Sequence, residues 1–134
     1  MDDIFVARLM SSDLQTVTPD TLVEEAAHQM QDNAVGSLVV VDEDNQLVGI
    51  LTTTDFVDIV AKSKPKAETT VERYMTTDVL TTTAQTSITD VADLMIEHGI
   101  HHVPVVDETE GVIGMISTTD LAGYISTVQT PSPA

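Results

Sequence analysis

Two short segments of the sequence combine a glycine, a hydroxyl side chain and an aspartate at the same spacing. The pattern is Gly-x-x-[Ser/Thr]-x-x-Asp, and its members are Gly49, Thr52, Asp55 and Gly114, Ser117, Asp120. An ionised aspartate can accept hydrogen bonds from two hydroxyl groups, and a helix N-terminus offers free backbone N–H groups to an anion. A Ser or Thr three residues before an acid is equally the spacing of a capping box. Spacing alone leaves ligand binding and helix capping both open.

Three histidines precede the second of these segments. His98, His101 and His102 could ligate a metal ion, but no carboxylates accompany them at a matching spacing, so we predict no metal site. The sequence has no cysteine, which excludes disulfides, thiolate metal sites and cysteine nucleophiles. It contains neither a Gly-x-Ser-x-Gly elbow nor a Walker loop. We therefore expect a protein that is not an enzyme and that has no obligatory cofactor.

The charge balance is strongly acidic. Twenty-two acids face five bases, which gives a formal charge of −17 and an isoelectric point near 4.1. Such a surface repels nucleic-acid phosphates, so no nucleic-acid partner is expected. An acidic surface with an ordinary apolar pattern also fits a protein adapted to high salt, where self-repulsion is screened. A halophilic source is therefore expected.

The sequence gives no sign of a membrane segment. No apolar run approaches the roughly 20 residues that span a bilayer. The first residues, Met1 to Ile4, lack the basic and apolar regions of a signal peptide. We expect a cytoplasmic protein without a membrane partner.

Most of the chain is one internal repeat. Sliding the sequence by 65 residues places Met10 on Met75, and agreement continues without a gap as far as Asp55 on Asp120. Agreement of this length indicates a duplication. Two units are too few for a solenoid or a propeller.

Each repeat has the pattern of a βαββα unit. In the first repeat, residues 14–18 are expected to be extended, and Thr21 and Glu24 have capping-box spacing at the start of a helix. Strands are expected at 38–41 and 47–52, joined by a polar turn at 44–46, and a second helix at about 53–61. The apolar face of the first helix is expected to contain Leu22, Val23, Ala26, Ala27 and Met30.

The second repeat is expected to follow the same order from Val79 to about Ser126, with its turn at Glu110 and Gly111. The corresponding helix face is expected to contain Ile88, Val91, Ala92, Met95 and Ile96. The domain boundaries are then repeat 1 at 1–61, a linker at 62–70, repeat 2 at 71–128 and a frayed tail at 129–134. One repeat alone would bury too little apolar surface to be secure. We expect an α/β (α+β) fold in which the two repeats pack as a pseudo-twofold pair.

Segments in both repeats resemble the CBS domain, named after cystathionine β-synthase. The first repeat has Val-Val-Val-Asp at 39–42 and Val-Gly-Ile-Leu-Thr-Thr-Thr-Asp at 48–55, and the second has His-Val-Pro-Val-Val-Asp at 102–107 and Gly-Met-Ile-Ser-Thr-Thr-Asp at 114–120. The resemblance extends from about Val6 to Tyr124, so the chain is similar to a CBS pair, or Bateman module. It implies two clefts that bind adenosine ligands such as AMP, ADP, ATP or S-adenosylmethionine. It also implies frequent dimers and control of an enzyme, channel or transporter without catalysis.

The resemblance implies roles for particular residues. Asp55 and Asp120 would accept hydrogen bonds from ribose hydroxyls, and Thr52 and Ser117 would lie near ribose or phosphate. The segment that contacts adenine in the family matches Val17 and Thr18 in the first repeat. In the second repeat it matches Leu80, Thr81 and Thr82. By propensity these segments are equally ordinary edge strands.

The two repeats differ where family members often place a basic residue toward phosphate. The second repeat has His101 and His102 there, whereas residues 33–37 of the first repeat contain no cation. We therefore expect the cleft with Ser117 and Asp120 to be the better nucleotide site. The alternative is that these histidines are surface or packing residues. Outside the linker the only other cations are Arg8 and Arg73, which could serve a phosphate or neutralise nearby acids.

The expected function is a regulatory module that binds an adenosine ligand in a cleft and controls a separate effector protein. Because cations are scarce, AMP, S-adenosylmethionine or methylthioadenosine fits better than a triphosphate. The alternative is a structural interaction module with unoccupied clefts. A homodimer is expected under both hypotheses, since the repeats carry apolar helix faces.

Overall fold

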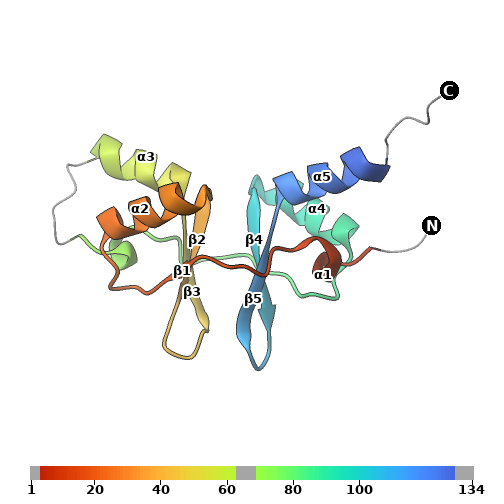
Figure 1. The fold of residues 1–134 in the computed structure, drawn as a ribbon, viewed down its shortest axis with the longest axis horizontal. Coiled ribbons are helices and arrows are strands. Elements are labelled where there is room, and N and C mark those ends of the chain that lie inside the picture. Colours follow the sequence, from red (N-terminus) through yellow and green to blue (C-terminus); the bar gives the residue numbers. More distant parts are fainter. Residues whose placement is uncertain (1–3, 63–68, 129–134) are drawn as a thin grey trace. The chain divides into compact units, whose positions relative to one another are not determined.

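The computed structural model describes residues 4–62 and 69–128, which form two compact units (Figure 1). Unit 1 contains residues 4–12, 80–107 and 113–128, and unit 2 contains residues 13–62, 69–79 and 108–112. Residues 63–68 of the expected linker and all of the expected tail lie outside the described residues.

Unit 2 is built around a three-stranded sheet with the order β1-β2-β3. β1 (Thr16–Val17) runs parallel to β2 (Ser37–Val41), and β3 (Leu47–Thr52) pairs with β2 in the antiparallel direction. The helix α2 (Val23–Asn33) joins β1 to β2, and α3 (Thr53–Lys62) begins directly after β3. This is the expected βαββα order.

The core of unit 2 is aliphatic, since aromatic residues make up only 3% of the sequence. Buried side chains of α2, both longer strands and α3 pack into one cluster, in which Leu38, Val40, Leu51 and Ile59 are almost fully buried. Burying an aliphatic side chain of this size stabilises the fold by roughly 1.5–3 kcal/mol. The short run of branched residues in β2 therefore anchors this unit.

Unit 1 has the same plan with a weaker first strand. α4 (Ile88–His98) is followed by β4 (His102–Asp107), β5 (Gly111–Ser117) and α5 (Thr118–Val128), and β4 and β5 form a two-stranded sheet. In place of a third strand, Thr82 forms an isolated parallel bridge to Val105. The Thr82 amide donates to the Pro104 carbonyl at 3.0 Å, and the Thr82 carbonyl accepts from the Val106 amide at 2.9 Å. The mixed α/β fold with two repeats is confirmed.

The opening segments of the two repeats are exchanged between the units. α1 (Val6–Leu9) comes from the start of the first repeat but belongs to unit 1, where the Val6 amide donates to Thr86 at 2.8 Å. The short 3₁₀ helix η1 (Val71–Arg73) comes from the start of the second repeat but belongs to unit 2, where the Val71 amide donates to Thr21 at 2.8 Å. Val6 and Val71 are both completely buried. Each unit therefore needs a segment of the other repeat to complete its core.

Two glycines allow these exchanged segments to approach the sheets. A Cβ atom on Gly114 would lie 2.8 Å from Met10 Sδ and 3.0 Å from the Ser11 carbonyl oxygen. A Cβ atom on Gly49 would meet Met75 Sδ at 2.8 Å and the Thr76 carbonyl oxygen at 2.9 Å. At each glycine one of the atoms met is a backbone carbonyl oxygen, which cannot rotate away as a side chain can. A side chain at either position would therefore have to displace the exchanged segment.

We expect Gly114→Ala to lower the free energy of unfolding by about 1–3 kcal/mol, the usual cost of overpacking a filled site. The matched control is Gly123→Ala in α5, where the new Cβ would meet no atom within 4 Å. That change should raise the free energy of unfolding by about 0.5–1 kcal/mol, because alanine is the better helix former. Denaturant unfolding of both variants measures the contrast, and equal effects would contradict the steric argument.

The turns of the two hairpins meet within unit 2. The Asn45 side-chain amide donates to the Glu110 carbonyl at 2.9 Å and to the Val112 carbonyl at 2.8 Å. The Asn45 carbonyl accepts from the Val112 amide at 3.0 Å. Asn45 and Gly111 both have positive φ angles, 63° and 82°. The expected turn residues are therefore found at turns, and they also bond to one another.

Two local expectations were wrong. Thr21 does not cap α2; the helix begins at Val23 after Leu22, which makes no side-chain cap bond, and the Thr21 hydroxyl instead accepts from the Thr18 amide at 3.1 Å. Ile96 was expected on the buried face of α4 but is 80% exposed. Val91 and Met95 fill that face, so Ile96 extends beyond the narrow stripe that the unit 1 core covers.

Candidate ligand-binding site

Ser117 and Asp120 join the end of β5 to the first turn of α5. Asp120 Oδ2 accepts from the Ser117 amide at 2.8 Å and from the Ser117 hydroxyl at 3.1 Å, and the Asp120 amide donates to Ser117 Oγ at 3.2 Å. This reciprocal pair is a capping arrangement. Among the described residues these bonds use Oδ2 of the aspartate and leave Oδ1 available to accept from a ligand. Helix capping and ligand binding are therefore compatible at this position.

Thr52 and Asp55 form the equivalent arrangement between β3 and α3. Asp55 Oδ2 accepts from the Thr52 amide at 2.8 Å and from the Thr52 hydroxyl at 3.2 Å. Both side chains are half-buried, as are Ser117 and Asp120. The duplicated sequence pattern is thus a duplicated structure, with one copy in each unit.

The two histidines lie beside the unit 1 copy. The His101 carbonyl accepts from the Thr118 amide at 3.0 Å, which holds the start of β4 against the start of α5. His101 is exposed and His102 is half-buried. Burial lowers the pKa of His102 below its ordinary value of 6.5, the neighbouring His101 lowers it further, and Asp120 acts in the opposite direction. The structure therefore brings both histidines into the neighbourhood of Ser117 and Asp120.

Leu80 and Thr81 precede the bridge between Thr82 and Val105. Because that pairing is parallel, Leu80 runs alongside the start of β4, close to the level of His102. Leu80 is half-buried and Thr81 is exposed. These two predicted residues thus lie beside the first residues of β4, which begins at His102.

Thr18 is not placed with Thr52 and Asp55. Val17 pairs with Val40, whereas Thr52 pairs with Ser37 at the other end of β2. At about 3.3 Å per residue, Thr18 lies on the order of 13 Å along the strands from Thr52. Its hydroxyl donates to Asp20, and the Thr18 amide donates to Thr21. Thr83, its counterpart, makes the same turn with Thr86, and a ligand contact of Thr18 stays a prediction.

A family model matches both repeats. The CBS domain model aligns with residues 6–62 and again with residues 71–127. This chain belongs to the CBS domain family.

A solved CBS pair shares the fold over nearly the whole chain. It is the CBS domain pair of protein MJ0100, in complex with 5′-methylthioadenosine and S-adenosyl-L-methionine. It covers 96% of this chain and 100% of its own, with 27% sequence identity and a TM-score of 0.88. A conserved protein from Pyrococcus horikoshii covers all of both chains, with 30% identity and a TM-score of 0.83.

Curated relatives match this chain over different shares of their own length. An uncharacterised 17.7 kDa protein of Acidianus ambivalens is 36% identical over 93% of this chain and 75% of its own length. A homoserine O-acetyltransferase of Methanosalsum zhilinae is 34% identical over 90% of this chain, but the match spans only 24% of that enzyme. The shared part corresponds to the CBS repeats.

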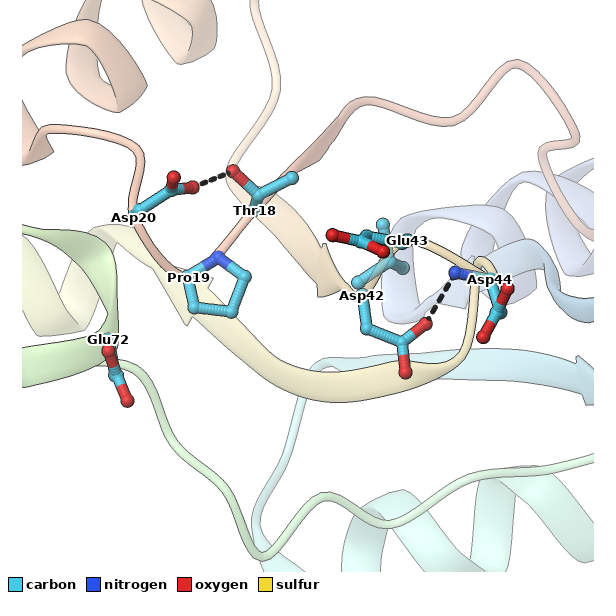
Figure 2. A pocket seen from close by; sticks show the side chains of 8 residues that line it. Thr18, Pro19, Asp20, Asp42, Glu43, Asp44 and Glu72 are labelled. Atoms are coloured by element: carbon cyan, nitrogen blue, oxygen red, sulfur yellow. Dashed lines mark hydrogen bonds between the residues drawn. The ribbon is translucent and has the colours of Figure 1, made fainter.

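One feature of this CBS pair was not predicted from the sequence. Unit 2 contains a cavity of about 610 Å³ beside the β2–β3 turn (Figure 2). Its lining is strongly acidic, with one threonine, one proline and one valine among carboxylates. The residues are Thr18, Pro19, Asp20, Val41, Asp42, Glu43, Asp44 and Glu72. Such a lining would repel a phosphate group.

The CBS pair also carries its two helical arginines on the exchanged segments. Arg8 lies in α1 of unit 1, and Arg73 lies in η1 of unit 2. Both are exposed.

Within residues 4–62 and 69–128, no group of three or more His, Asp or Glu side chains could hold a metal ion. No helix in the same residues has the length and apolarity needed to cross a membrane.

Proposed function

We propose that this CBS pair is a regulatory module that binds an adenosine-containing ligand at the Ser117–Asp120 site of unit 1. The observation that carries the proposal is the half-buried aspartate with a free Oδ1, at the N-terminus of α5 and beside two histidines. The MJ0100 pair, of the same fold, binds 5′-methylthioadenosine and S-adenosyl-L-methionine. Its ligands support the adenosine class.

Different residues of unit 1 bind different parts of the ligand. Asp120 accepts hydrogen bonds from the ribose hydroxyls through Oδ1, and the Ser117 hydroxyl lies toward the ribose or phosphate. Leu80 and Thr81 contact the adenine. His101 and His102 face the substituent on the ribose 5′ carbon. In unit 2, Thr52 and Asp55 would contact the ribose in the same way, but Gly36 and Ser37 stand in the places of the two histidines.

The charge of the molecule favours ligands with little negative charge. With 22 acids and five bases, the chain offers few cations to neutralise a triphosphate. AMP, S-adenosylmethionine and methylthioadenosine are therefore the proposed ligands, with no obligatory cofactor. The module is not catalytic, and its output is a change in its affinity for a separate effector protein. The ligand can drive that change only by binding one state of the module more tightly than the other.

Calorimetric titration of the purified protein with AMP, ATP, S-adenosylmethionine and methylthioadenosine tests the function. Multimolar KCl is included because of the acidic composition, and circular dichroism establishes that the sample is folded. We expect saturable binding of at least one ligand, with ATP weaker than AMP. Flat titrations of folded protein with all four ligands would overturn the proposal.

A second candidate function is self-association, and a groove in unit 1 favours it. The groove, about 270 Å³, lies between α4 and α5 and is mostly apolar. Its lining residues are Ile88, Thr89, Ala92, Asp93, Leu121, Tyr124 and Ile125. A second copy of the chain is the proposed occupant. In a twofold homodimer the same patch of both subunits forms the interface, so this apolar face would be covered by an equally apolar face.

Ile125→Asp is expected to dissociate such a homodimer, because it buries an unpaired carboxylate in the interface. The control is Ile96→Asp, since Ile96 is exposed on α4 but does not line the groove. Sedimentation at several protein concentrations gives the dimer fraction of each variant. Dissociation by both substitutions, or by neither, would contradict this assignment of the interface.

A further inference from the structure

We infer that protonation of His102 selects, by charge, which adenosine ligands the unit 1 site binds. With His102 protonated, the site favours a ligand that carries a phosphate. With His102 neutral, it favours a ligand whose 5′ substituent is uncharged or positive. The inference rests on the proposed function and specifies the ligand class of that same site.

The placement of the two histidines is the first argument. They are consecutive residues at the start of β4, and the His101 carbonyl is bonded to the first amide of α5. His102 also interacts electrostatically with Asp120, so a ligand held by Asp120 in the first turn of α5 would lie beside His102. The counterparts of His101 and His102 in unit 2 are Gly36 and Ser37, and Gly36 makes the same bond to Thr53 at 3.2 Å. The backbone is thus the same in both units, and only unit 1 has titratable groups there.

The charges around His102 are few. His101 on its own segment disfavours the protonated form, and Asp120 from α5 favours it. The other charged or titratable side chains on elements of unit 1 belong to α1, α4, α5 and the end of β4. They are Arg8, Asp90, Asp93, Glu97, His98, Asp107 and Tyr124. Burial lowers the pKa of His102 below 6.5, so in the ligand-free site this imidazole is neutral at pH 7.5 and gains its proton only in acid.

Binding linkage fixes the direction of the effect. A bound phosphate favours the protonated imidazole and raises its pKa, so proton uptake accompanies binding and affinity for AMP rises as the pH falls. S-adenosylmethionine carries a net positive charge, so its affinity falls over the same range. Methylthioadenosine is uncharged and serves as the reference. A change of one unit in pKa on binding corresponds to a tenfold change in affinity.

The experiment compares AMP, methylthioadenosine and S-adenosylmethionine at pH 7.5 and pH 5.5, with wild type and the His101→Gln, His102→Gln double variant. Ionic strength is kept near 0.1 M if the protein stays folded, because salt screens the effect. The phosphate of AMP itself titrates near pH 6. The wild-type to variant affinity ratio removes this contribution, because it is common to both proteins.

We expect the ratio for AMP to rise about tenfold from pH 7.5 to pH 5.5, and the ratio for S-adenosylmethionine to fall by a similar factor. The ratio for methylthioadenosine should stay constant. His98→Gln, on α4, should behave as wild type. The two single variants replace the double variant if the latter fails to fold.

The outcomes separate the two proposals. Methylthioadenosine binding with pH-independent ratios for both charged ligands would overturn the inference and leave the proposed function standing. Absence of binding by any adenosine ligand would overturn the proposed function, and the inference with it. Opposite pH trends for AMP and S-adenosylmethionine in wild type, abolished in the double variant, would support both.

Discussion

Gly111→Ala is expected to lower the free energy of unfolding by about 3–5 kcal/mol, the largest loss among the single substitutions considered. Gly111 is buried and has a φ of 82°, a conformation that side chains rarely adopt. A Cβ atom there would collide with the Asn45 carbonyl, lying 2.7 Å from its carbon. The carbonyl cannot retreat without breaking its bond to the Val112 amide.

Thermal or denaturant unfolding of Gly111→Ala measures this loss, which should reduce the melting temperature by roughly 10 °C or more. Gly99→Ala is the matched control. Gly99 also has a positive φ, 63°, but a Cβ atom there would meet no atom within 4 Å. It should therefore cost only the conformational strain, about 1–2 kcal/mol. Equal losses in the two variants would show that the contact with Asn45 does not matter.

Asp120→Ala is expected to weaken binding of the adenosine ligand by about 100-fold or more. Hydrogen bonds to a charged group contribute roughly 1.5–3 kcal/mol each, and the proposed ribose contact uses two hydroxyls. The same substitution removes the bonds from the amide and hydroxyl of Ser117, so it should also cost about 1 kcal/mol of stability. Calorimetric titration beside denaturant unfolding separates the two effects.

Ser87→Ala provides the control for the stability effect. Ser87 caps α4 by accepting from the Asp90 amide at 3.2 Å, away from the candidate site. It should lose comparable stability with ligand affinity unchanged. Asp55→Ala reports whether the copy in unit 2 also binds. If Asp120→Ala changed stability alone, the duplicated aspartates would be helix caps, and the interaction-module hypothesis would be favoured.

The strands could be predicted because their signal is local. The branched run at 38–41 and the stretch from Leu47 to Thr52 are bounded by polar turn residues, and β2 and β3 match them to within one residue. The site pattern was also local, since Ser117 and Asp120 are three residues apart. Their hydrogen bonds follow from that spacing at a helix N-terminus.

The parts that could not be predicted depend on contacts between distant residues. Thr21 has the spacing of a capping box, but its hydroxyl accepts from the Thr18 amide. Its carbonyl accepts from the Val71 amide at the start of η1, a residue 50 positions away in the chain. The exposure of Ile96 depends on which part of α4 the core of unit 1 covers. The neighbourhood of His102 and Asp120, 18 residues apart in the chain, was expected only through the resemblance to the CBS domain, because it depends on how β4 meets α5.

The exchanged opening segments carry a consequence for the ancestry of the molecule. In a single ancestral repeat whose opening segment pointed away as it does here, the place of Val6 or Val71 would be empty, and a second copy could fill it. Reciprocal donation between two separate polypeptides would have satisfied both. Gene duplication with fusion would place both donated segments in one chain and leave the two halves free to diverge. The histidines of one half, against the glycine and serine of the other, are a difference of that kind.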